Sequence, residues 1–287
     1  MSNRIAFITC VVFSLFAAPL VVASELEEAE SQQVEESKDG KRFSLKDFSF
    51  RAGFYNISAN TRIRLDALGG LIGTTIDLED DLDLDENKST YYLSFGWRVS
   101  GRHFLEFEYF NLDRRGTATL TAEIEFGDEV FDIGAEVKSF FDTDVTRVSY
   151  AYLLKDSDKF AFALSAGLHI TDLNTGITEI NSQFAQDTVA VAAVTAPLPV
   201  VGLTAAWKMS DKWFMYGRLQ IFRLTFDDFS GRLDHVSVKL EYNMFEHVGV
   251  GLGYDFFAMG VDVDRKLWNG DVTFSFKGPI LYLKGQF

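Results

Sequence analysis

Apolar residues alternate with polar or small residues at a period of two along most of this sequence, from about Phe43 to the last residue. The stretches YYLSFGWRV at 91–99 and FAFALSAGLHI at 160–170 are typical examples. Successive side chains of a β-strand point to opposite faces, so each stretch predicts a strand with one apolar face and one small or polar face. Helical periodicity is not evident in this part of the sequence, and we therefore expect an all-β fold.

The alternation predicts about ten antiparallel strands, within a range of about eight to twelve. The connections alternate in character, because short polar turns are followed by connections that are longer or lie on extended hairpins. The predicted strands are 46–66, 72–99, 103–126, 130–154, 160–177, 198–209, 213–226, 232–244, 247–265 and 271–287. The short turns are 100–102, 155–159, 210–212 and 245–247, and the other connections are 67–71, 126–129, 178–197, 227–231 and 266–270.

Two all-β architectures are compatible with alternating strands. A soluble sandwich buries the apolar faces between two sheets, whereas a membrane barrel turns them out to lipid and turns the polar faces in to the lumen. Aromatic residues near strand ends suit the interfacial girdles of a membrane barrel, and the two kinds of connection suit its two ends. These aromatic residues are Trp97, Trp207, Trp213 and Tyr242. We therefore predict a transmembrane antiparallel β-barrel over residues 43–287.

A barrel in hydrocarbon must close, because every backbone N–H and C=O group has to be paired there. Closure predicts that the first strand, near Phe48–Phe54, pairs with the last strand, near Leu281–Phe287. Within the last strand, Gly278-Pro279 predicts a β-bulge, since proline cannot donate a hydrogen bond to the ladder.

The residues before the barrel have a different composition. Residues 1–24 combine a short positive region with an apolar run and a small-residue end, which predicts a secretory signal peptide. A transmembrane anchor is the alternative, but Pro19 and the acidic residues that follow favour cleavage. Cys10 lies in this segment and is the only cysteine, so the mature chain is expected to hold no disulfide and no thiol nucleophile. Residues 25–42 are polar and acidic and predict a flexible segment.

The end of the chain carries a recognisable pattern. It reads Tyr282-Leu283-Lys284-Gly285-Gln286-Phe287, and a terminal Phe after an alternating strand resembles the last strand of Gram-negative outer-membrane barrels. In that class the pattern implies recognition of Phe287 by the barrel-assembly machinery. Gly285 departs from the pattern, because an aromatic or bulky residue often stands two positions before the end.

The mature chain as a whole resembles small outer-membrane β-barrel proteins, including the outer membrane protein A-like and W-like groups. The stretch Gly73–Leu82 and the turn Arg102-His103 are similar to stretches of uncharacterised proteobacterial barrels. The resemblance implies a location in the bacterial outer membrane, with membrane lipid and lipopolysaccharide as neighbours. It implies no substrate and no catalytic residues.

Charged residues recur on the faces that are expected to point into the lumen. A ten-stranded barrel is narrow and is largely filled by its own side chains, and buried charges must be paired or hydrated. An interior salt-bridge network that plugs the lumen is therefore the leading prediction, and a narrow polar pore is the alternative. The residues are Arg51, Arg98, Glu106, Glu108, Arg147, Lys208, Arg218, Lys239, Glu241 and Asp255.

The chain has 27 basic and 42 acidic residues and a formal net charge of -15, which argues against a nucleic-acid partner. Several of the acids lie in the run 77–86 (DLEDDLDLDE), whose carboxylates are suited in type to Ca²⁺ or Mg²⁺. The run lacks the glycine of an EF-hand loop and a glutamate twelve positions from Asp81, so a solvated acidic segment is favoured over a metal site. A looser alternative is that divalent ions bridge the run to lipopolysaccharide phosphates.

One pair of residues suggests catalysis. His235-Val236-Ser237 places an imidazole and a hydroxyl on one strand face, with Glu241 further along it, and nucleophilic catalysis needs such a base and an orienting carboxylate. Some outer-membrane lipid A deacylases use a His–Ser–acid constellation, which this pair resembles. The pair is expected to face the lumen, away from lipid, so we predict no catalytic, cofactor-binding or metal site. P-loop, Rossmann and zinc-protease motifs are absent from the sequence.

Two outer segments are expected to project from the membrane. Residues 116–138 predict a long hairpin that turns at Gly127-Asp128, because its limbs are much longer than the roughly 9–11 residues that cross a bilayer. Ala190–Pro199 is an apolar part of another outer connection. We therefore expect a structural or surface-interaction barrel that is open to an extracellular ligand at its outer loops, with pore activity and a lipid-modifying hydrolase as the alternatives.

Overall fold

The computed structural model describes residues 47–65, 74–180, 188–226, 229–265 and 268–287, all within the unit Arg42–Phe287. The predicted signal peptide 1–24 and the acidic segment 25–42 lie outside the described residues. Among the described residues, no helix is long and apolar enough to cross a membrane. These residues instead form strands joined by turns, as the alternation predicts.

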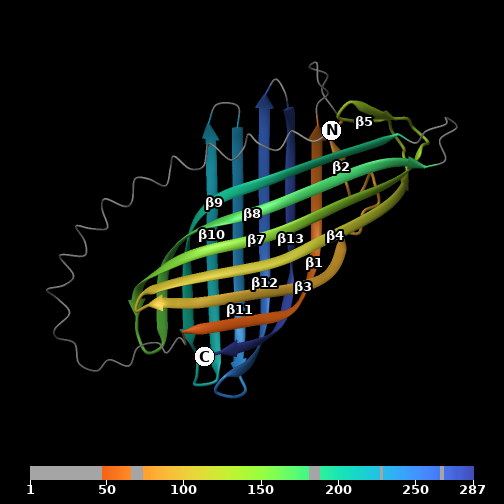
Figure 1. Cartoon of the computed structure of the whole chain (residues 1–287). Coiled ribbons are helices and arrows are strands. Elements are labelled where there is room, and N and C mark those ends of the chain that lie inside the picture. Colours follow the sequence, from red (N-terminus) through yellow and green to blue (C-terminus); the bar gives the residue numbers. More distant parts are fainter. Residues whose placement is uncertain (1–46, 66–73, 181–187, 227–228, 266–267) are drawn as a thin grey trace. The chain divides into compact units, whose positions relative to one another are not determined.

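The long strands of the described residues form a closed antiparallel ring (Figure 1). In chain order they are β1 (Phe48–Leu65), β3 (Asn87–Ser100), β4 (His103–Thr119), β7 (Glu136–Asp156), β8 (Phe160–Ile180), β9 (Val189–Lys208), β10 (Trp213–Phe226), β11 (Phe229–Asn243), β12 (Val248–Arg265) and β13 (Trp268–Gln286). Each strand pairs with the next, and β13 pairs back onto β1 with Phe50 opposite Gly285 and Phe54 opposite Leu281. The predicted closure between the first and last strands is confirmed.

Three short strands lie at one end of the ring (Figure 1): β2 (Ile76–Asp77), β5 (Ile124–Phe126) and β6 (Glu129–Phe131). β2 pairs with β1, while β5 and β6 form their own hairpin about a turn at Gly127, whose φ is 65°. The N–H of Thr74 donates to the carbonyl of Glu125 at 3.3 Å, and the N–H of Glu125 donates to Oγ1 of Thr74 at 3.2 Å. Segments 74–86 and 120–135 are therefore joined, and we call them together the acidic cap.

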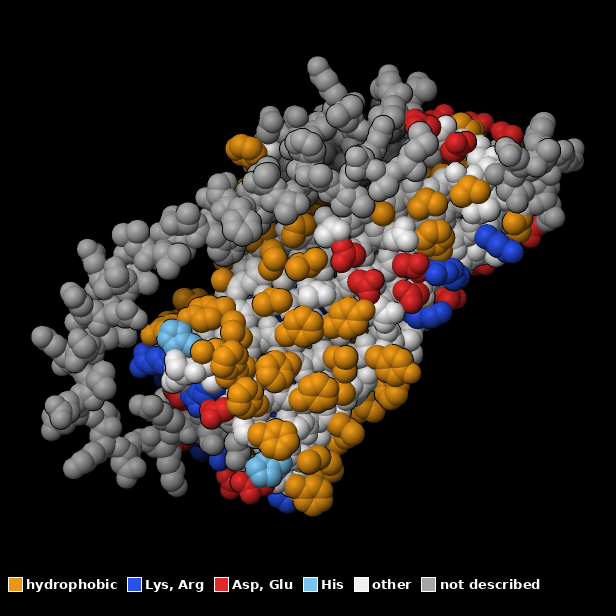
Figure 2. All heavy atoms as spheres, in the orientation of Figure 1, with side chains coloured by type: hydrophobic (Ala, Val, Ile, Leu, Met, Phe, Trp, Pro, Cys, Tyr) orange, Lys and Arg blue, Asp and Glu red, His pale blue; other side chains and the backbone are white. Residues whose placement is uncertain are grey.

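The outer face of the barrel is divided into two parts. Nearest the short turns, outward side chains are large, apolar and exposed; on β8 this run extends from Phe160 to Ile170, about the length that crosses a bilayer. Beyond it charged and other polar side chains become frequent on the face shown in Figure 2. On β8 the outward residues there include Asp172 and Asn174, whereas β9 exposes Val189 and Val191. A continuous apolar band around a closed ring fits lipid rather than water. We call the part of the barrel that carries this apolar band the membrane zone, and we call the part beyond it, away from the short turns, the extension.

The inner face changes in the opposite sense. The lumen of the extension is lined by buried apolar residues such as Phe141, Leu173 and Met259, and not by the polar residues predicted for the whole lumen. On four strands the change occurs at two adjacent aromatic residues, of which the first faces outward and the second is buried inside. These pairs are Phe54-Tyr55 on β1, Tyr91-Tyr92 on β3, Tyr109-Phe110 on β4 and Phe256-Phe257 on β12.

Three expectations about strands are corrected. The predicted strand 72–99 is wrong in its first part, because the leucines of 76–86 turn into the lumen and β3 begins only at Asn87. The predicted connection over 178–197 is also wrong, because β8 continues to Ile180 and β9 begins at Val189; Leu198 and Val200 face the core.

The third correction concerns the predicted bulge at Gly278-Pro279. The register between β12 and β13 runs through these residues without a shift, and shifts occur instead between Arg98 and Ser100 and between Leu153 and Lys155. On the other side of the strand, pairing with β1 is interrupted only opposite Asn56 and Ile57. A Cβ on Gly278 would lie 1.8 Å from the carbonyl oxygen of Asn56, so the glycine permits close approach of the two backbones.

Candidate functional site

A buried charge cluster crosses the lumen near the boundary between the membrane zone and the extension. Nη1 of Arg147, on β7, lies 3.5 Å from Oε2 of Glu108 on β4 and 3.3 Å from Oδ2 of Asp255 on β12. The guanidinium also lies over the rings of Phe110 and Phe257, at 5.3 and 5.5 Å from their centroids. Buried charges are tolerated only when paired, so this arginine ties three strands together across the barrel.

The network continues toward the short turns through two carboxylates, Glu108 itself and Glu241. Glu108 accepts hydrogen bonds from Nζ of Lys239 at 2.8 Å and Nη1 of Arg218 at 2.9 Å, and Arg218 also pairs with Glu106. The second centre is Glu241, which lies 2.8 Å from Nε of Arg51 and 2.7 Å from Nζ of Lys284. The predicted interior salt-bridge network is confirmed. All ten residues predicted to face the lumen are buried there or line the cavity described below.

Aromatic rings fill the lumen on the extension side of this network. The rings of Tyr55, Phe110 and Phe276 meet edge to face, at centroid distances of 5.3 to 6.1 Å. Phe257 stacks on Phe276 at 4.6 Å. A polar pore requires a hydrated path, and this packing places apolar side chains across its course.

The predicted His–Ser pair does face the lumen, but its geometry is not that of a relay. Ser237 Oγ donates to Oδ1 of Asp255 at 2.5 Å, and Nε2 of His235 lies 3.2 Å from Oδ2 of the same carboxylate. The two residues therefore share an acid, and the acid is Asp255 rather than Glu241. Nucleophilic catalysis instead requires the base to accept the hydroxyl proton of the nucleophile.

The acidic run 77–86 forms part of the acidic cap. Its hydrophobic residues, including Leu78, Leu82 and Leu84, are buried, while its carboxylates are mostly exposed. The exceptions are Asp77, which pairs with Arg62 at 3.1 Å, and Glu79. Glu79 pairs with the fully buried Arg114 and accepts from the N–H of Thr61 at 2.8 Å. Within the described residues, no three His, Cys, Asp or Glu side chains are placed to hold a metal ion.

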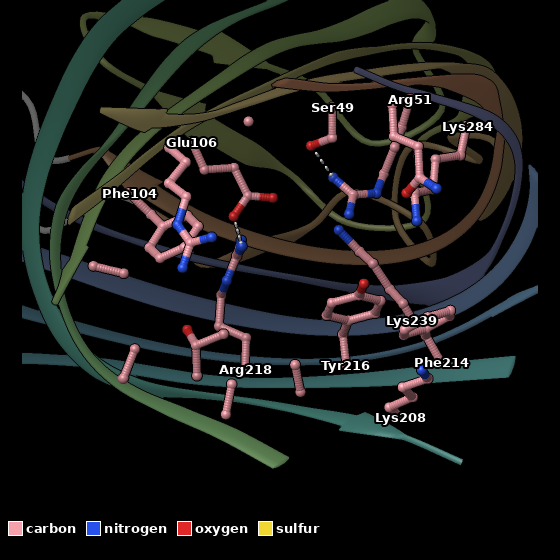
Figure 3. Close-up of a pocket in the computed structure, with 18 of the residues that line it drawn as sticks. Ser49, Arg51, Phe104, Glu106, Lys208, Phe214, Tyr216, Arg218, Lys239 and Lys284 are labelled. Carbon is pink, nitrogen blue, oxygen red and sulfur yellow. Dashed lines mark hydrogen bonds and ion pairs between the residues drawn. The ribbon is translucent and has the colours of Figure 1, made fainter. Parts of the chain in front are cut away.

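A cavity of about 590 Å³ opens inside the membrane zone at the short-turn end, and we call it the vestibule. Cations from β1, β10, β11 and β13 line one side, including Arg51, Arg218, Lys239 and Lys284 (Figure 3). Small residues from β7, β8 and β9 line another part of the wall, beside β10. They are Ser149, Ala151, Ala161, Ala163, Ser165, Thr204 and Ala206.

Several residues of the network were not among the predicted inward charges. Lys284 was considered only as part of the terminal pattern, although its alternation with Leu281 and Leu283 places it on the opposite, inward face. Tyr92 and Tyr282, which donate to Glu108 and Glu241, stand in positions that alternation also turns inward. The parity of these residues along the strand was the signal that could have identified them.

Comparisons with known proteins agree with the architecture. No protein-family model and no curated protein sequence matches the chain. Among solved structures it is similar to the outer membrane protease OmpT from Escherichia coli, with a TM-score of 0.55 and 11% identity over 88% of this chain and 100% of that one. It also matches the Pseudomonas putida toluene transporter TodX, with 9% identity, a TM-score of 0.34 and coverage of 88% and 91%.

A third similar structure is Ail, the attachment invasion locus protein of Yersinia pestis, with 10% identity, a TM-score of 0.32 and coverage of 83% and 99%. The chain therefore has the fold of a Gram-negative outer-membrane β-barrel. The apolar band around its own outer face fits a location in the bacterial outer membrane. Short turns lie at the periplasmic end of such barrels, so we expect the vestibule to face the periplasm and the extension to face the cell exterior. The resemblance to the A-like and W-like groups stays a prediction.

Proposed function

We propose that this protein is a non-enzymatic, non-conducting barrel that presents the acidic cap at the cell surface for interaction with a cationic partner. The observation that carries the proposal is the two-sided construction of the cap. Leu82, Phe126 and Phe131 anchor its inner side in the core of the extension, while its outer side carries carboxylates. The cap contains no Lys or Arg, and its exposed acids include Asp80, Asp81, Asp83, Asp85, Glu86, Glu123, Asp128, Glu129 and Asp132.

The cap is held in place by specific contacts, which favours a defined binding surface. Arg114 pairs with Glu79 and donates to Thr61, so it links the cap to β4 and β1. The backbone at Leu82 passes so close to β4 that a Cβ on Gly116 would lie 2.3 Å from its carbonyl oxygen. A preorganised surface loses less conformational entropy on binding than a mobile loop.

The proposal also covers the interior and the ends of the barrel. The lumen of the extension is filled by side chains, which supports a barrel that does not conduct ions. His235 and Ser237 both contact Asp255 and face the lumen, away from lipid, which supports a barrel that does not hydrolyse lipid. Recognition of Phe287 by the barrel-assembly machinery remains an expectation. This residue is 68% exposed beside the β1–β13 junction, and its ring stacks on that of His247. Membrane lipid and lipopolysaccharide are the other expected partners.

Binding of fluorescent oligolysine to the purified barrel in non-ionic detergent tests the interaction. The variant Asp128→Asn/Glu129→Gln/Asp132→Asn removes three charges from the cap, and we expect its affinity to fall about tenfold at low salt. The matched control Asp158→Asn/Asp211→Asn/Glu246→Gln removes three charges from the periplasmic turns and should bind like the unmodified protein. Equal loss in the two variants would contradict a cap-specific surface.

Planar-bilayer recording tests the closed lumen separately. We expect no conductance steps from the unmodified protein, because the rings between Arg147 and the extension leave an apolar barrier to ions. Stable steps would refute the non-conducting part of the proposal. The enzymatic alternative predicts that Ser237→Ala changes the mass spectrum of the host's lipid A, whereas we expect the two spectra to be identical.

A further inference from the structure

We propose that the vestibule is a binding site, open to the periplasm, for small anions that carry a carboxylate or phosphate group on a compact apolar body. The cavity of about 590 Å³ lies within the usual range of small-molecule sites, roughly 300–1,000 Å³. It lies at the opposite end of the barrel from the acidic cap. The inference therefore stands independently of the interaction proposed for the cap.

The first argument is an excess of buried positive charge. Arg51 and Lys284 are 8% and 4% exposed, and both pair with the single carboxylate of Glu241. Among the described residues, no second carboxylate forms an ion pair with either side chain, so one of the two cations is left without an equal counter-charge. The remaining bonds of the two side chains are to neutral groups: Nη1 of Arg51 lies 3.4 Å from Ser49 Oγ, and Nζ of Lys284 lies 3.4 Å from Asn243 Oδ1.

The neighbouring centre does not supply the missing charge. Glu108 holds Lys239, Arg218 and Arg147, while Glu106 and Asp255 provide further carboxylates for those arginines. A buried cation without a counter-charge is costly, so a bound anion at Arg51 and Lys284 would relieve that cost. Figure 3 shows the polar ends of Arg51, Lys239 and Lys284 on the same side of the vestibule.

The second argument is the composition of the remaining wall. The inward residues of β7, β8 and β9 at this level, among them Ala151, Ala163 and Ala206, are too short to fill the lumen, in contrast to the rings of the extension. Aromatic rings border the cationic corner. The guanidinium of Arg51 lies 5.8 Å from the ring centroid of Tyr216, and Nζ of Lys284 lies 5.6 Å from that of Phe214. The anionic group of a ligand would therefore meet cations while its apolar body meets alanines and rings.

Calorimetric titration of the whole protein in non-ionic detergent tests the site, with benzoate and phenyl phosphate as probes and neutral benzamide as the uncharged comparison. We expect one or both anions to bind and benzamide to bind at least about tenfold more weakly, because charge-assisted hydrogen bonds are the strong contacts of the site. The relative affinities of benzoate and phenyl phosphate show whether the site takes a carboxylate or a phosphate.

Two variants test the two kinds of residue that line the vestibule, the cations and the small residues. Lys284→Met removes the excess charge and leaves Arg51 paired with Glu241, while Ala163→Phe fills the small-residue wall without a change of charge. Each should weaken anion binding about tenfold or more. Lys277→Met removes an outward, exposed cation from the same strand, β13, and should bind normally.

Gel electrophoresis checks that each variant is folded: a folded barrel migrates faster in the unheated sample than after it has been unfolded by heating. If Lys284→Met does not fold, Lys284→Arg keeps the charge and is expected to keep binding. Absence of binding by either anion, equal binding of benzamide, or full affinity in both wall variants would overturn the proposal.

Discussion

The membrane zone and the extension are built from the same strands, yet their side chains are arranged in opposite ways. In the membrane zone, Val148 and Leu164 face outward and are exposed, while charges such as Arg147 fill the lumen. In the extension most outward residues are polar, as at Asp144, and the inward residues are large and apolar, as at Phe141. The comparison shows that the solvent around each part decides which face of a strand is apolar.

The two parts are consequently held together by different forces. In the extension, water surrounds the barrel, so burial of apolar side chains in the lumen stabilises it as in a soluble protein. In the membrane zone, lipid already solvates the apolar face. There the strands are stabilised by closed backbone hydrogen bonding and by charge pairs across the lumen.

The largest effect is expected from two neighbouring phenylalanines of β7 on opposite faces of the extension. Phe141→Ala should lower the free energy of unfolding by about 3–5 kcal/mol, because the ring is fully buried and packs on Phe274. Phe140→Ala should cost under about 1 kcal/mol, since this ring lies on the outer face against Arg115. Urea unfolding in detergent measures both. Similar costs would show that the lumen of the extension is not a packed core.

A second comparison concerns ion pairs in the two parts. Arg147→Met should cost about 3–5 kcal/mol, because it leaves the carboxylates of Glu108 and Asp255 buried with less compensation. Arg223→Met breaks an exposed pair with Asp234 on the outside of the extension and should cost about 1 kcal/mol or less. The loss of unfolding free energy in each variant is measured at low and high salt. Only the loss caused by Arg223→Met should depend on salt, because only the exposed pair is screened. A strong salt dependence of the Arg147 effect would contradict burial of its pairs.

The smallest effect is expected from a charge added to the outer face of β8. Leu164 lies in the middle of the apolar run, so Leu164→Arg should destabilise the barrel in lipid vesicles by about 2–4 kcal/mol because it places a charge in hydrocarbon. Asn174→Arg lies ten positions further on the same face, in the extension, and should change stability by about 0.5 kcal/mol at most. If Asn174→Arg were equally harmful, the membrane boundary would lie further along the strand than the apolar band indicates.

Much of the barrel could be predicted from local pattern. Period-two alternation identified most strands, and the backbone requirement of hydrocarbon predicted the junction of β1 with β13. The reversal of faces was missed, although the sequence carries a sign of it in the adjacent aromatic residues Tyr91-Tyr92 and Phe256-Phe257. Two large apolar neighbours break the alternation, and each such break marks the level at which the apolar face moves from outside to inside.

The candidate site could be predicted only in outline. Inward charges were identified by parity, and their pairing into a plug was expected because buried charges need partners. The vestibule was not predicted, because a cavity depends on the volumes of side chains that face one another from distant strands, such as Ala163 and Lys284.

Local sequence pattern is enough to predict that this chain forms strands, that the strands close into a barrel, and which alternate residues face inward. These properties follow from backbone geometry and from the local order of apolar and polar residues. The folded barrel was needed to show that Arg147 meets Glu108 and Asp255, that two cations share Glu241, and that the cap covers the core of the extension. Those contacts depend on strand register and tilt, which bring together residues far apart in the chain and cannot be derived from any single strand.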